Sequence, residues 1–168
     1  MTRRLILMRH AKSSWKDSDL SDHDRKLNGR GRRSADAIGP WLAARGHVPD
    51  EVLTSSSART RETWARIAPH LPGAPAATQA PALYLATPET LLRVLQGATG
   101  ACVGLLAHNP GIAAFADSLV AARPAHADFA RYPTLATLVV EFEIDTWADL
   151  APGTGRVVDF IVPRELTD

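Results

Sequence analysis

The chain has 168 residues and a mass of 18.1 kDa, a length that suits one domain. Hydrophobic residues make up 45% and charged residues 22%, which excludes a disordered tail or a fibrous repeat. The formal net charge of +1 hides a split, because residues 1–66 hold 14 basic and 8 acidic side chains, whereas residues 67–168 hold 5 and 10. Of the basic residues 16 are arginine, whose planar guanidinium suits bidentate contacts with phosphate, so an anionic ligand is expected.

Cysteine content and hydropathy indicate the compartment. The single cysteine, Cys102, cannot form an intramolecular disulfide, and no Cys/His cluster predicts structural zinc. The apolar run near the amino terminus stops at Arg9, short of the roughly 7–15 residues of a signal-peptide core. No stretch approaches the roughly 20 apolar residues that span a bilayer. We therefore expect a soluble cytoplasmic protein with no membrane partner.

Apolar runs typical of strands alternate along the chain with the three- and four-residue spacing of helices. The first expected strand, 5–8, leads into a polar surface loop at 15–24, and Asn28 and Gly46 bound the first helix. The later expected elements are strands at 51–54, 101–106, 137–144 and 157–162, a short edge strand at 76–79, and helices at 58–67, 88–95 and 112–120. This order predicts one three-layer α/β/α domain over residues 1–168, with a mostly parallel central sheet whose last two strands are antiparallel neighbours.

Unusual polar residues follow three of these strands, and ligands of open α/β sheets bind at such carboxyl ends. They are Arg9-His10, the segment 55–59 with Arg59, and His108-Asn109. Two guanidinium groups there would supply forked donors for a tetrahedral dianion, and two imidazoles could serve as nucleophile or proton donor. Because no cluster of carboxylates adjoins them, the pattern favours phosphoryl transfer without Mg²⁺ or another cofactor.

Three motifs carry a resemblance to a known family. Arg9-His10-Ala11-Lys12, Ser55-Ser56-Ser57-Ala58-Arg59 with Thr63, and His108-Asn109-Pro110 resemble the histidine phosphatase superfamily, also called phosphoglycerate mutase-like. The resemblance spans residues 5–162, and the short chain is most similar to the SixA branch of phosphohistidine phosphatases. It implies that His10 is the phosphate-accepting nucleophile, that Arg9 and Arg59 clamp the phosphate, and that His108 donates to its oxygens.

Four further residues are expected to contact substrate. Ser13 matches the hydroxyl position of the longer mutase motif, Lys16 falls where mutases carry an asparagine, and Asn109 belongs to the third motif. Arg25 borders the loop, where with Lys12, Lys16 and Lys26 it either steers an acidic phosphoprotein or forms a solvated rim. Trp15 either packs beside the pocket or anchors its loop.

The chain departs from the family pattern in one way that concerns the chemistry. Ala11 and Ser56 replace a frequent glycine and proline without removing a catalytic group, but no carboxylate stands at 83–85, where the acidic proton donor falls. Substitutes could come from the loop or from the third expected helix; the carboxylates are Asp17, Asp19, Asp22 and Glu89. Alkoxide leaving groups need protonation, and losing a general acid costs about 10²–10⁴ in rate, whereas imidazole departs with little help.

The missing donor therefore favours a phosphohistidine substrate in a phosphotransfer or phosphocarrier protein of signal transduction. One alternative is a small-molecule phosphomonoesterase of the same superfamily, and another is a noncatalytic phosphohistidine-binding module. A nucleic-acid partner is disfavoured, because no aromatic residues interleave with the arginines of 30–33. The oligomeric state is left open. The remaining histidines are expected at the surface; they are His23, His47, His70 and His126.

Overall fold

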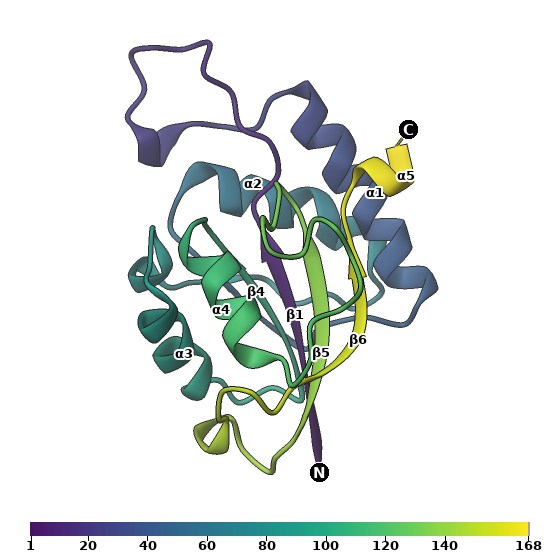
Figure 1. Cartoon of the computed structure of the whole chain (residues 1–168). Helices are drawn as coiled ribbons and strands as arrows, with labels where there is room; N and C mark the ends of the chain where they lie inside the picture. Colours follow the sequence, from purple (N-terminus) through teal and green to yellow (C-terminus); the bar gives the residue numbers. More distant parts are fainter. Residues whose placement is uncertain (168) are drawn as a thin grey trace.

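The computed structural model describes residues 1–167, and a six-stranded sheet crosses them in the order β3-β2-β4-β1-β5-β6 (Figure 1). The strands are β1 (Thr2–Arg9), β2 (Glu51–Thr54), β3 (Thr78–Gln79), β4 (Cys102–Ala107), β5 (Thr137–Glu143) and β6 (Arg156–Ile161). The first four strands are mutually parallel, whereas β5 is antiparallel to both β1 and β6. The mostly parallel α/β sheet is confirmed, and its antiparallel part lies at the β5–β6 side.

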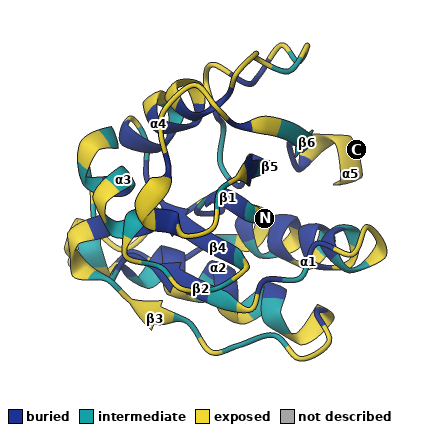
Figure 2. Ribbon diagram, turned by 90° about the horizontal axis from the view of Figure 1, so that it is seen from below, coloured by how far each residue is buried: buried dark blue, intermediate teal, exposed yellow. Residues whose placement is uncertain are grey.

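Helices cover both faces of the sheet. They are α1 (Gly29–Ala44), α2 (Ala58–Ile67), α3 (Pro88–Gln96), α4 (Gly111–Leu119) and α5 (Arg164–Thr167), with short 3-10 turns at Asp22–Asp24, Ala68–His70, Pro81–Leu83 and Trp147–Asp149. Side chains from α1 and α2 share one core with Ile6 and Met8, and those from α3 and α4 share another with Leu5 and Leu7. Because successive residues of a strand face opposite sides, the continuous apolar run of β1 is buried in both cores (Figure 2).

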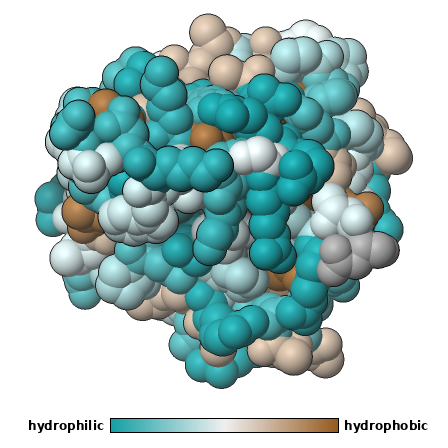
Figure 3. Space-filling view, turned by 90° about the horizontal axis from the view of Figure 1, so that it is seen from above, coloured by the Kyte–Doolittle hydropathy of each residue, from teal (hydrophilic) through white to brown (hydrophobic). Residues whose placement is uncertain are grey.

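The carboxyl ends of the parallel strands β1–β4 meet at the edge of the sheet from which the segment 11–24 projects (Figure 1). Seen from above, this edge presents a largely hydrophilic surface (Figure 3). β1, β4 and β2 are adjacent and parallel, so the residues after these three strands come together there. This order and direction of the strands positions the candidate site.

The amino-terminal turn of α1 packs against the segment that follows β1. The amide of Asn28 donates to the carbonyl oxygen of Lys12 at 3.0 Å, and the Asn28 side chain accepts from the amide of Gly31 at 2.8 Å. A Cβ added to Gly31 would lie 2.1 Å from the Lys12 carbonyl oxygen, so only glycine permits this approach. The contact fixes the backbone two residues beyond His10.

We expect Gly31→Ala to lower the free energy of unfolding by about 1–3 kcal/mol, because the Lys12 backbone must move. Urea denaturation measures the change. Gly29→Ala is the matched control, since its Cβ would meet only the end of the Arg33 side chain, at 3.4 Å. Equal stability of the two variants would contradict the close packing.

Candidate active site

The three motifs form one pocket at the carboxyl ends of β1, β2 and β4. The amide of His10 donates to Ala107 O at 3.2 Å, and the amide of Ser55 donates to Leu106 O at 3.1 Å, so the pairing of the strands continues into the motifs. The pocket has a volume of about 310 Å³. Its lining residues are Arg9, His10, Lys12, Ser13, Trp15, Asp22, Arg25, Arg59, Leu85, His108, Asn109 and Thr134.

The geometry of His10 identifies its nucleophilic nitrogen. Nδ1 lies 2.7 Å from the carbonyl oxygen of Ala11, which can only accept, so Nδ1 carries the proton. Nε2 therefore holds a lone pair, and the Nε–H group of Arg59 lies 3.4 Å from it. Burial is the main cause that lowers the pKa of His10 to about 3, and the charges of His108, Arg59 and Arg9 act in the same direction. The ring is thus neutral and able to attack at physiological pH.

His108 faces His10 across the pocket, with 5.2 Å between the ring centroids. Its Nε2 lies 2.7 Å from Ser55 Oγ, which orients the ring, and its buried Nδ1 has no hydrogen-bond partner within residues 1–167. Burial, followed by the charge of Arg59, lowers the pKa of His108 to about 3. An arriving phosphate dianion would favour protonation of this ring, so His108 is placed to donate to a phosphate oxygen.

Two guanidinium groups add positive charge to the pocket. Arg59, in the first turn of α2, is 3% exposed, and its Nη1 donates to Asp22 O at 2.7 Å. Arg9 donates from Nη1 to Tyr132 O at 3.2 Å, and its buried Nε has no partner in the described part of the chain. Burial and the nearby charge of Arg59 lower the pKa of Arg9. An anion between the two would relieve this repulsion and accept from the free donor.

Among residues 1–167, one carboxylate, that of Asp22, lines the pocket. Arg59 Nη2 donates to Asp22 Oδ2 at 3.1 Å, Arg25 Nη2 donates to Asp22 Oδ1 at 3.1 Å, and the Tyr84 hydroxyl donates to Oδ2. The Tyr84 bond is the largest cause that lowers the pKa of Asp22, and the two arginines add to it. Asp22 is therefore ionised at neutral pH and lacks the proton that a general acid must give.

The other expected substrate contacts divide between the pocket and its surroundings. Arg25 and Ser13 line the pocket, and Arg25 Nη1 donates to Ser13 Oγ at 2.6 Å. Asn109 lines it too, and its Nδ2 donates to Arg131 O at 2.9 Å. Lys16 lies instead in a neighbouring depression with Lys26, so a substrate contact by Lys16 stays a prediction.

The structure shows contacts of three residues around the pocket that the sequence did not predict. Ser55 holds the ring of His108, and Thr63 Oγ1 accepts from the amide of Ala11 at 3.0 Å, next to the nucleophile. Tyr84, which belongs to the segment 83–85 where the resemblance places an acidic proton donor, donates to Asp22. Ser55 and Thr63 belong to the second motif, which was the available signal, but no pattern in the sequence indicated the Tyr84–Asp22 contact.

The lowered pKa of His10 predicts a dependence of stability on pH. In the unfolded chain a histidine takes up its proton near pH 6.5, but folded His10 takes it up near pH 3. Between these values the unfolded state binds the extra proton, so the free energy of unfolding falls as the pH falls, by up to about 1.4 kcal/mol per pH unit. Urea titrations from pH 7 to 4 should show a shallower slope in His10→Ala than in the parent. Parallel slopes would contradict the neutral ring.

Within residues 1–167, no group of three or more His, Cys, Asp or Glu side chains is placed to hold a metal ion. Burial raises the pKa of Cys102 to about 11, which disfavours a thiolate nucleophile.

None of the helices between residues 1 and 167 is both long and apolar enough to span a membrane.

Comparison with known proteins agrees with this geometry. The histidine phosphatase superfamily (branch 1) matches residues 5–83. An uncharacterised protein of Mycobacterium tuberculosis is 35% identical over 164 residues, which cover 94% of this chain and all of that protein. Among solved structures, the putative phosphohistidine phosphatase SixA from Nakamurella multipartitia is 31% identical, with a TM-score of 0.78 and 97% of each chain covered.

The putative phosphohistidine phosphatase SixA from Agrobacterium tumefaciens gives the same TM-score, 0.78, at 27% identity, with 96% of this chain and 98% of that chain covered. Both likenesses extend over nearly the whole chain and not only over the residues that match the family. Together with the pocket of paired histidines and arginines, they show that the chain belongs to the histidine phosphatase superfamily.

Proposed function

We propose that this protein hydrolyses phosphohistidine in a protein substrate, through a phosphorylated His10. The observation that carries the proposal is a neutral His10, with an unprotonated Nε2, in a pocket whose carboxylate, Asp22, is held ionised. Such a pocket supplies a nucleophile and anion-binding donors but no carboxylic acid to protonate an alkoxide. A substrate with a good leaving group suits it best.

The first chemical step transfers the phosphoryl group to His10. The Nε2 lone pair attacks phosphorus, the bond between phosphorus and the substrate's ring nitrogen breaks, and its electron pair stays on that nitrogen. The substrate ring departs as neutral imidazole when its other nitrogen carries a proton, so the enzyme supplies none. Arg9 and Arg59 balance the phosphoryl charge while the Nδ1–H group of His10 keeps its proton and its hydrogen bond to Ala11 O.

The second step returns the enzyme to its starting state. Water attacks phosphorus on the phosphorylated His10, the bond to Nε2 breaks, and inorganic phosphate leaves with the protons of the water. His108 is placed to donate to a phosphate oxygen in both steps. Positioning and electrostatics therefore supply most of the catalysis, and the reaction needs no metal or cofactor.

The rim of the pocket supports a macromolecular substrate. Trp15 and Leu85 line the pocket, yet they are 74% and 56% exposed. The centroid of the Trp15 ring lies 3.5 Å from the guanidinium carbon of Arg25. Leu85 also has a φ of 50°, a left-handed conformation that is unfavourable for leucine. Exposed tryptophan beside arginine is typical of residues that anchor a protein partner, and docking would bury both apolar side chains.

The proposal is tested by comparing kcat/KM on phosphohistidine proteins with kcat/KM on sugar phosphates and other phosphomonoesters. We expect a preference of at least about 10²-fold for phosphohistidine, the low end of what a general acid contributes to ester hydrolysis. Faster turnover of a phosphomonoester would instead establish a small-molecule phosphatase. Saturable binding of the phosphohistidine protein without phosphate release would establish a binding module.

A further inference from the structure

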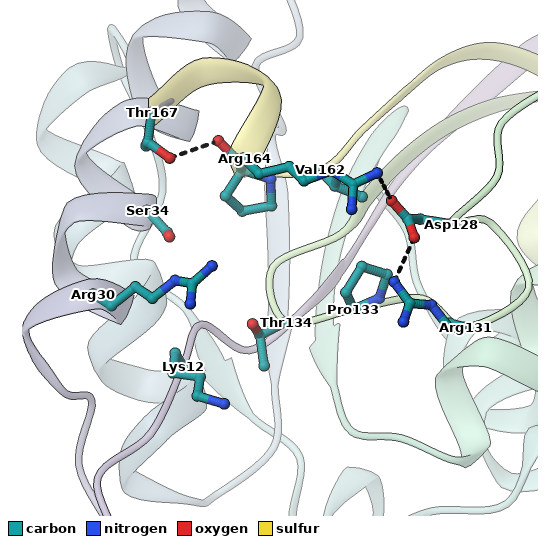
Figure 4. Close-up of a pocket in the computed structure, with 11 residues that line it drawn as sticks. Lys12, Arg30, Ser34, Asp128, Arg131, Pro133, Thr134, Val162, Arg164 and Thr167 are labelled. Atoms are coloured by element: carbon teal, nitrogen blue, oxygen red, sulfur yellow. Dashed lines mark hydrogen bonds and ion pairs between the residues drawn. The ribbon is translucent and has the colours of Figure 1, made fainter.

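A second cavity, of about 190 Å³, lies next to the active site (Figure 4). The start of α1, the segment 128–134 and α5 form its walls. Lys12 and Thr134 line both this cavity and the catalytic pocket, so the two adjoin. A group bound in the cavity would therefore adjoin the substrate at His10.

The charges of this cavity are unbalanced. Arg131 and Arg164 both pair with the carboxylate of Asp128, and Figure 4 shows the three side chains together on one wall. Lys12 and Arg30 lie on the opposite wall, and neither forms an ion pair within residues 1–167. Among the described residues that line the cavity, four cations thus face one carboxylate, and two of these cations have no ion pair and can bind an anion.

The wall that carries Lys12 and Arg30 is held rigidly to the catalytic segment. Gly31, next to Arg30, packs directly against the Lys12 backbone, and Asn28 bonds to Lys12 O. The buried Ser34 hydroxyl, one turn along α1, adds a further polar group to the same wall. The backbone positions that carry the two cations are thereby fixed relative to His10.

We propose that this basic groove, defined by Lys12, Arg30, Arg131 and Arg164, binds an acidic segment of the phosphorylated protein substrate. The proposal rests on the proposed function, because it describes how the phosphohistidine protein is recognised. The cations stand on opposite walls instead of converging on one point, which suits a chain with several carboxylates better than a single small anion. Charge complementarity of this kind contributes to partner choice and to the association rate.

Charge reversal of Arg30 tests the groove, with Arg33 as the matched control. Both are exposed arginines of α1, but only Arg30 lines the groove. We expect Arg30→Glu to raise KM for an acidic phosphohistidine protein by about tenfold or more without changing kcat, and Arg33→Glu to change it far less. Hydrolysis of phosphoramidate, which is too small to reach the groove, should be unchanged in both variants. Equal KM effects of the two variants would overturn the groove while leaving the proposed function intact.

A binding measurement separates the groove from the catalytic proposal. A fluorescently labelled peptide of alternating Glu and Gly is titrated against the parent and both variants, with a Gln and Gly peptide as the neutral probe. We expect affinity for the acidic peptide to fall in Arg30→Glu well below that in Arg33→Glu and to decrease with added salt. No difference between the variants would overturn the inference. A larger loss of affinity for the acidic peptide in Arg30→Glu than in Arg33→Glu would support the groove, even if the protein hydrolyses no phosphohistidine protein. Such a lack of hydrolysis would contradict the proposed function alone.

Discussion

Replacing His10 with alanine is expected to reduce phosphatase activity by at least about 10³-fold, the largest single effect in this protein. The reason is that Nε2 of His10 is the atom that forms the bond to phosphorus. The other imidazole that lines the pocket, His108, is held by Ser55 with its ring centroid 5.2 Å from that of His10, so it does not occupy the position from which His10 attacks. Phosphate release from a phosphohistidine protein, followed with excess enzyme and in steady state, measures the loss.

The controls distinguish lost chemistry from lost fold. His70→Ala removes an exposed histidine that does not line the pocket, and we expect it to keep nearly full activity. The His10→Ala variant should still unfold cooperatively in urea at pH 7. If this folded variant kept more than a small fraction of the parent activity, another group would have to be the nucleophile.

Replacing Arg59 with alanine is expected to reduce kcat/KM by about 10²–10³-fold, the range measured when one donor to a developing anionic charge is removed. Arg59 is buried, its Nε–H group lies 3.4 Å from the nucleophilic nitrogen, and its charge helps to keep both histidines neutral. Arg59→Lys should recover little of the activity, because an ammonium group cannot reproduce the planar fork.

Arg61→Ala is the matched control for Arg59. Arg61 lies in the same first turns of α2, but it is exposed and its Nε bonds to Ser56 O. We expect kcat/KM to change less than threefold, because substitutions of exposed residues outside the pocket have small effects. A comparable loss in Arg61→Ala would mean that positive charge on α2 in general, and not a guanidinium in the pocket, supports the reaction.

Much of the fold follows from local patterns in the sequence. The strand Glu51–Thr54 and the helix Ala58–Ile67 have the predicted bounds, because an apolar run and a serine N-cap mark them clearly. The first strand is longer than expected, since pairing with β5 continues to Thr2, beyond the apolar residues. Pairing partners lie far away in the sequence, so periodicity alone could not define these ends.

The site shows the same division between local and distant information. His10, Arg59 and His108 could be brought together from the sequence, because each follows a strand of a parallel sheet and the carboxyl ends of such strands meet. The role of Asp22 could not, since it depends on a loop folding back onto Arg59 and Tyr84. A flexible-looking polar loop gives no periodic signal for such a contact.

His47 is a prediction that was wrong. Its place in a polar turn indicated a surface histidine, but the side chain is buried, with 3% exposure. Its Nε2 lies 2.7 Å from a carboxylate oxygen of Asp159, and its Nδ1 lies 3.1 Å from a guanidinium nitrogen of Arg4. These partners are more than 40 residues away in the chain, so only the tertiary structure supplies the pairing that permits burial.

The most direct test of the account is to trap and locate the phosphorylated enzyme. The protein is mixed with phosphoramidate, quenched in alkali, and examined by phosphorus NMR and peptide mass spectrometry. We expect acid-labile phosphate on Nε2 of His10, because Nδ1 is occupied by its hydrogen bond to Ala11 O. Phosphate on His10 Nδ1 or on His108, or undiminished turnover in His10→Ala with no phosphorylated enzyme, would contradict it.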